Sequence, residues 1–71
     1  MSGGGTLIDP ADERRWQRCT LYDLQSERQA ELAYGRALVK MSADELAVMT
    51  CRARVVRLEE IILARGHRPD A

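Results

Sequence analysis

Apolar residues recur with helical spacing along two long stretches of the chain, and helix-start and helix-stop signals separate these stretches. The first stretch follows Asp9, a good helix cap, and begins with Pro10, which is favoured at the first helical position. We therefore predict a first helix over about residues 10–40. Its broad face consists of Trp16, Cys19, Thr20, Leu24, Ala30, Tyr34, Ala37, Leu38 and Met41.

The middle of this first helix has the weakest pattern. Residues 25–29 contain no apolar side chain, and Ser26 with Gln29 has the spacing of a capping box. An alternative is therefore a break near Gln25 into two shorter helices.

The second stretch has a signal at each end. Ser42 and Glu45 have the spacing of a capping box, and Met41 with Leu46 could form the hydrophobic staple around it. Gly66 supplies a left-handed stop. These signals predict a second helix over about residues 43–65.

The two helices predict an all-α fold, an antiparallel helical hairpin in a domain over residues 9–66. The Gly-rich residues 1–8 are expected to form a disordered tail, and residues 67–71 a short polar tail.

The second helix carries two apolar faces, which Arg52 and Glu59 separate. One neighbouring helix can cover only one of them, so we predict a homodimer that forms a four-helix bundle. The alternative is a monomer in which a broken first helix covers both faces. The predicted dimer interface, here called the inner seam, consists of Val48, Cys51, Val55, Leu58 and Ile62. The second face, here called the outer stripe, consists of Leu46, Met49, Ala53, Val56 and Leu63.

The composition of the chain limits the possible partners and the possible location of the protein. Eleven basic and eleven acidic residues cancel, which disfavours direct binding to nucleic acid. Two cysteines are too few for a disulfide framework, and nothing resembles a secretory signal or a membrane span, so we expect a cytoplasmic protein without a membrane partner.

The residues that usually carry out catalysis are scarce. The single histidine, His67, follows the predicted helix stop, and Cys19 and Cys51 belong to no metal-ligand spacing. We read both cysteines as small buried residues. We therefore expect no enzyme, no metal or cofactor, and no small-molecule substrate.

Several residues of the first helix are candidates for binding a larger protein. Trp16 stands among arginines, a combination that often dominates binding energy, although it could equally anchor the core. Asp23, Glu27 and Glu31 recur every four residues on or beside the face of Trp16 and Tyr34. They could form an acidic strip that binds a basic partner protein. The alternative is pairing across the helices, with Glu31 opposite Arg52 and Glu27 opposite Arg57.

One local pattern resembles a known family. The segment from Ser42 to Val48, with Arg18-Cys19 before it and Arg57-Leu58 after it, resembles part of the Hha/YmoA nucleoid-associated modulators. The resemblance implies a helical co-regulator that acts through a DNA-binding partner.

The sequence thus predicts a non-enzymatic interaction module, an adaptor or inhibitor that docks a helix face onto a larger regulatory protein. The alternatives are a nucleic-acid-associated co-regulator, in which Arg14, Arg15 and Arg18 contact phosphates, and a small structural or assembly subunit of the phage-virion or secretion co-chaperone type.

Overall fold

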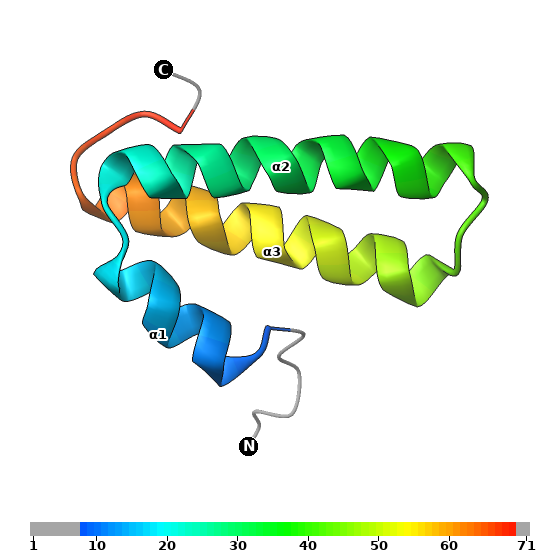
Figure 1. Cartoon of the computed structure of the whole chain (residues 1–71), viewed down its shortest axis with the longest axis horizontal. Coiled ribbons are helices and arrows are strands. Elements are labelled where there is room, and N and C mark those ends of the chain that lie inside the picture. Colours follow the sequence, from blue (N-terminus) through cyan, green and yellow to red (C-terminus); the bar gives the residue numbers. More distant parts are fainter. Residues whose placement is uncertain (1–7, 70–71) are drawn as a thin grey trace.

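The computed structural model describes residues 8–69, which form three α-helices and no strand (Figure 1). Helix α1 spans Pro10–Arg18, α2 spans Leu21–Lys40 and α3 spans Glu45–Ala64. The all-α prediction is confirmed. Nearly all of the predicted N-terminal tail, residues 1–7, lies outside the described part of the chain, as do the last two residues.

Helices α2 and α3 lie side by side and antiparallel, and a short loop joins them (Figure 1). Helix α1 lies beside α3, near the end of the pair opposite this loop. Residues 8–69 therefore form three helices where the hydrophobic pattern predicted two.

The predicted first helix is divided at Cys19 and Thr20, whose backbones are both extended. The Thr20 Oγ1 atom accepts the Asp23 N–H at 3.1 Å, so Thr20 caps α2. The prediction of one continuous helix is wrong, and so is the alternative break near Gln25. Residues 25–29 are helical in the middle of α2.

The predicted capping box at Ser42 is also wrong, because Ser42 ends α2 and does not start α3. Its φ is 55°, and its N–H donates to the Val39 carbonyl at 3.1 Å, while the next N–H, that of Ala43, donates to Leu38 at 3.0 Å. These bonds form a Schellman ending. Helix α3 begins later than predicted, after Asp44, whose side chain makes no capping hydrogen bond.

The other predicted helix ends agree with the structure. The Asp9 carboxylate accepts the Ala11 N–H at 2.8 Å at the start of α1. Gly66 has a φ of 83° and follows the end of α3, where its N–H donates to the Leu63 carbonyl at 2.9 Å. Local sequence signals therefore predict these two ends.

The hydrophobic core lies at the end of the α2–α3 pair that α1 covers. Its buried members come from all three helices and are Trp16, Leu24, Leu58, Ile61 and Ile62. Leu38 and Cys51 are also buried, nearer the loop. The half of the pair next to the loop thus has fewer buried apolar side chains.

Candidate functional site

Arg54 of α3 connects the three helices through one side chain. Its Nη1 atom lies 2.6 Å from the Asp12 carboxylate of α1, and its Nε atom lies 2.8 Å from the Glu31 carboxylate of α2. The guanidinium also stands 5.0 Å from the ring centroid of Trp16, within the range of a cation–π interaction. Hydrogen bonding to Arg54 lowers the pKa of Asp12. This half-buried arginine therefore fixes α1 against the other two helices.

Arg57, one turn further along α3, holds the first turn of α1. Its Nε and Nη2 atoms donate to the two carboxylate oxygens of Glu13, both at 2.8 Å. These hydrogen bonds, with a further one from Gln17, lower the pKa of Glu13 to about 2. Such a bidentate pair is stronger and more directional than a single ion contact.

Arg65 caps the other end of α1. Its guanidinium donates to the backbone carbonyls of Cys19 at 2.6 Å and Gln17 at 3.0 Å. A cation at the C-terminus of a helix satisfies free carbonyl groups and interacts favourably with the helix dipole. Arg54 and Arg57 of α3, and Arg65 at its C-terminal cap, are thus used within the chain.

The predicted acidic strip is largely neutralised by other residues of the chain. Glu31 pairs with Arg54, and Glu27 pairs with Arg15 at 3.0 Å. The pKa of Glu27 is lowered, chiefly by its hydrogen bond from Arg15. Asp23 is exposed at the start of α2. The carboxylates do form ion pairs between helices, but not with the predicted partners Arg52 and Arg57.

The two aromatic candidates for partner binding differ in their exposure to solvent. Trp16 has no exposed surface and belongs to the core, which corresponds to the anchor alternative. Tyr34 is 59% exposed on α2. A protein that docks onto the folded chain can therefore contact Tyr34 but not Trp16.

The two faces of α3 also differ from the prediction. Cys51, Leu58 and Ile62 of the inner seam are buried within the single chain, so they are not available for a dimer interface. Val48 and Val55 are half-buried. By contrast, the large residues of the outer stripe are exposed: Leu46, Met49, Val56 and Leu63. The predicted surplus of apolar surface is present, but on the other face.

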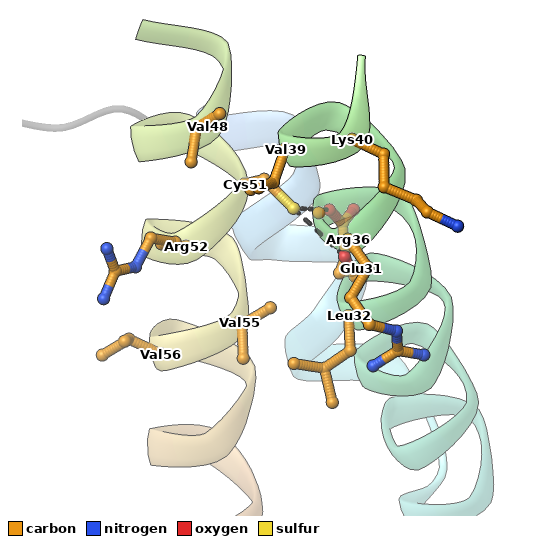
Figure 2. Close-up of a pocket in the computed structure, with 11 residues that line it drawn as sticks. Glu31, Leu32, Arg36, Val39, Lys40, Val48, Cys51, Arg52, Val55 and Val56 are labelled. Atoms are coloured by element: carbon orange, nitrogen blue, oxygen red, sulfur yellow. Dashed lines mark hydrogen bonds between the residues drawn. The ribbon is translucent and has the colours of Figure 1, made fainter. Parts of the chain in front are cut away.

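An apolar groove of about 740 Å³ runs between α2 and α3 in the half of the pair next to the loop (Figure 2). In Figure 2 the ribbon of α1 passes behind the two helices, so the groove opens on the face away from α1. The floor contains Gly35 and Cys51. The apolar walls consist of Leu32, Val39, Val48, Val55 and Val56. We call the floor and the walls together the α2–α3 groove.

Three cations flank this groove, and we call them the cationic rim: Arg36 and Lys40 on α2, and Arg52 on α3. Figure 2 shows Lys40 and Arg52 directed outward on opposite sides of the groove. None of the three forms an ion pair with another residue of 8–69. Glu31, the one acidic lining residue, is paired with Arg54. The rim therefore has an uncompensated positive charge.

Cys51 places a thiol at the floor of the groove. The Sγ atom of Cys51 lies 3.1 Å from the Glu31 carbonyl, and burial raises the pKa of its thiol. A raised pKa lowers the fraction of the reactive thiolate. Within residues 8–69 no group of three or more potential ligands could hold a metal ion, and no helix there is long and apolar enough to cross a membrane. Cys19 is half-buried and unpaired, and His67 is exposed beyond α3.

Sequence reasoning missed the α2 side of the groove. Leu32 and Val39 lie seven residues apart and outside the broad face assigned to the first helix. This spacing was a usable signal of a second apolar face. The unpaired charges of Arg36 and Lys40 become visible only when their neighbours in space are known.

Comparison with protein-family models, curated proteins and solved structures finds no match to this chain. The partial resemblance to the Hha/YmoA modulators therefore gains no support beyond the residues that suggested it.

Proposed function

We propose that this chain is a non-enzymatic protein interaction module, an adaptor or inhibitor that docks onto a larger protein through the α2–α3 groove. The observation that carries the proposal is an open apolar groove bordered by a cationic rim that has no acidic partner among residues 8–69. Contiguous exposed apolar surface bordered by polar residues is typical of an interaction site. The proposal keeps the cytoplasmic location that the sequence predicts from too few cysteines for a disulfide framework and from the lack of a recognisable secretory signal.

The dimensions and charge of the groove favour one class of partner. An amphipathic helix can place its apolar face between two parallel or antiparallel helices. Acidic residues on its flanks would meet Arg36, Lys40 and Arg52, and such complementarity increases specificity and the association rate. The proposed partner segment is therefore an acidic amphipathic helix.

The proposal includes a homodimer. In it, the helical hairpin of α2 and α3 pairs with the same hairpin of a second copy. The exposed outer stripe supports this part of the proposal, since it contains four large apolar side chains. Burying such surface yields about 25 cal/mol per Å². The groove and the outer stripe are neighbouring surfaces that share Val56.

The test compares partners bound by the wild type and by two variants of exposed α2 residues. Val39→Glu places a carboxylate in the groove, whereas Ala33→Glu adds the same charge outside it. A specific partner should bind the wild type and Ala33→Glu but not Val39→Glu. Its isolated binding segment should carry apolar residues at helical spacing and acidic flanks, and should bind more weakly as salt is raised.

The control for folding is the circular dichroism of each variant, which should stay helical. A partner retained equally by Val39→Glu would overturn the groove as the docking site. So would a purified binding segment without acidic residues, or one whose affinity does not change in the variant Arg36→Glu/Lys40→Glu.

A further inference from the structure

The outer stripe of α3 has a spacing that reads the same in both directions along the helix. Its positions are 46, 49, 53, 56 and 63, and Glu60 occupies the remaining position of the pattern. Steps of three and four residues alternate between successive positions, as in the seam of a two-helix coiled coil. A helix with such a seam can pair with a reversed copy of itself.

From this symmetry we infer that α3 pairs with α3 of a second copy, antiparallel and in one register. Leu46 of each copy lies opposite Leu63 of the other, and Ala53 lies opposite Val56. The inference rests on the proposed homodimer and adds the surface, the orientation and the register. The pairing uses Val56 and Arg52, which also line the groove, so the two proposed surfaces meet along α3.

The apolar residues in this register are accessible in the single chain. Leu46 and Leu63 are each 58% exposed, and Val56 is 53% exposed. The small Ala53 opposite Val56 lets the two helix backbones approach near the twofold axis. Met49, which adapts to irregular surfaces, packs on the aliphatic part of Glu60. The carboxylate of Glu60 is held at the edge of the stripe by Arg57, at 3.1 Å.

Charges beside the stripe select the antiparallel orientation. Arg52 and Glu59 lie on the same edge, so twofold pairing places Arg52 of each copy opposite Glu59 of the other. Arg52 has no ion pair within residues 8–69, and the Oε1 atom of Glu59 makes no hydrogen bond there. Arg28 holds the other oxygen of Glu59 at 2.8 Å, which positions this carboxylate.

A parallel pair would have the opposite effect. It would bring Arg52 of one copy next to Arg57 of the other, because these positions flank the seam five residues apart. Two like charges at an interface disfavour that arrangement. The other edge of the antiparallel pair joins Arg57 with the neutral Thr50, so it contains no such conflict.

The twofold arrangement also fixes where the remaining surfaces lie. Arg52 lies on the groove side of α3, and Arg57 on the side of α1. In an antiparallel pair, equivalent edges meet on the same side. The α1 helices of both copies therefore lie on one face of the dimer, and both grooves open on the opposite face.

The experiment combines solution mass with cysteine cross-linking of the full chain. Two variants, Leu46→Cys and Leu63→Cys, are prepared with Cys19→Ser, while Cys51 is buried and is left in place. Light scattering should give twice the 8.0 kDa mass of the chain for the wild type. Mild oxidation of the two variants together should give a covalent dimer, and oxidation of either alone should not.

A matched control mixes Leu63→Cys with Ala33→Cys, which is exposed on α2 outside the stripe and should not cross-link. A second pair, Ala53→Cys with Val56→Cys, tests the same register near the axis and should cross-link when mixed. Cross-linking of Leu46→Cys alone would show parallel pairing and overturn the inference.

The outcomes separate this inference from the proposed function. A dimeric mass without mixed cross-links in either pair would overturn the register and leave the homodimer. A strictly monomeric mass would overturn both the register and the homodimer, while the groove proposal would still be tested by its own variants.

Discussion

Gly35 of α2 lies directly against Cys51 of α3: a Cβ atom on residue 35 would stand 3.1 Å from the Cys51 Sγ atom. The missing side chain thus permits close contact between the two helices at the floor of the groove. It has a cost, because glycine inside a helix is about 1 kcal/mol less favourable than alanine.

This relationship predicts a coupling between the two positions. Gly35→Ala should stabilise the chain by about 1 kcal/mol when residue 51 is alanine, and by less when Cys51 is present, because the Sγ atom must then move. Chemical denaturation of the two single variants and the double variant measures this difference. Equal effects of Gly35→Ala in both backgrounds would show that the sulfur does not limit the contact.

Trp16 should be essential for folding, since it is fully buried between the helices. Trp16→Ala should cost about 3–5 kcal/mol, which is close to the whole stability of a domain of this size. Circular dichroism should therefore show loss of helix, and Trp16→Phe should lose less. A fully helical Trp16→Ala variant of unchanged stability would contradict a core role for Trp16 and favour a role in binding a partner protein.

Acid should weaken the docking of α1 through Glu13. Its pKa falls from 4.5 to about 2 in the folded chain, so the ionised carboxylate stabilises the fold. This contribution is complete above the ordinary pKa and is lost as the pH falls from about 5 through the folded value. The lowered pKa values of Asp12 and Glu27 act in the same direction.

The measurement is the free energy of unfolding between neutral and acidic pH. Glu13→Gln should have a shallower dependence on pH than the wild type. Glu45→Gln, which removes an exposed carboxylate that forms no ion pair within residues 8–69, serves as the control. Identical slopes for the wild type and Glu13→Gln would rule out the Arg57 pair as a source of acid sensitivity.

Arg54 and Arg52 offer a matched comparison of two arginines on one helix. Arg54→Lys loses the planar group that contacts Asp12, Glu31 and Trp16 together, so it should cost about 1–3 kcal/mol. Arg52→Lys keeps the charge at an exposed position and should be nearly neutral. Thermal unfolding measures both, and equal effects would contradict the connecting role of Arg54.

Replacing Ser42 by glycine should increase the stability of the fold. The Ser42 φ of 55° is unfavourable for most side chains, and Gly66 occupies the equivalent position after α3. Ser42→Gly should therefore stabilise the chain by about 1 kcal/mol. The control Ser26→Gly, inside α2, should destabilise it by a similar amount. A destabilising Ser42→Gly would instead support a capping role for the serine side chain.

The sequence predicted what depends on local signals. The Asp9 cap and the Gly66 stop were recognisable because each uses neighbouring residues. The role of Ser42 was predicted wrongly because a serine side chain can cap the start of a helix, while its backbone can also form a Schellman ending. Only the backbone hydrogen bonds to α2 show which of the two roles Ser42 has. The break at Thr20 was missed because that residue fitted the periodic face.

The candidate site was less predictable, because it depends on residues far apart in the sequence. The outer stripe was visible from the pattern of α3, but the sequence could not show which of the two faces α1 and α2 would cover. The pairing of Glu31 with Arg54 also needed the third helix. The groove appears only when Leu32 and Val39 are brought beside Val48 and Val55.

The one-sided position of the core has a consequence for motion. Five buried residues join the helices at the end covered by α1, whereas Leu38 and Cys51 are the buried apolar side chains nearer the loop. Local unfolding costs least where buried apolar contacts are fewest. The backbone amides of α3 near Val48 should thus exchange with solvent faster than those near Leu58. A helix bound in the groove would join α2 and α3 at this end, so its binding energy would also slow that exchange.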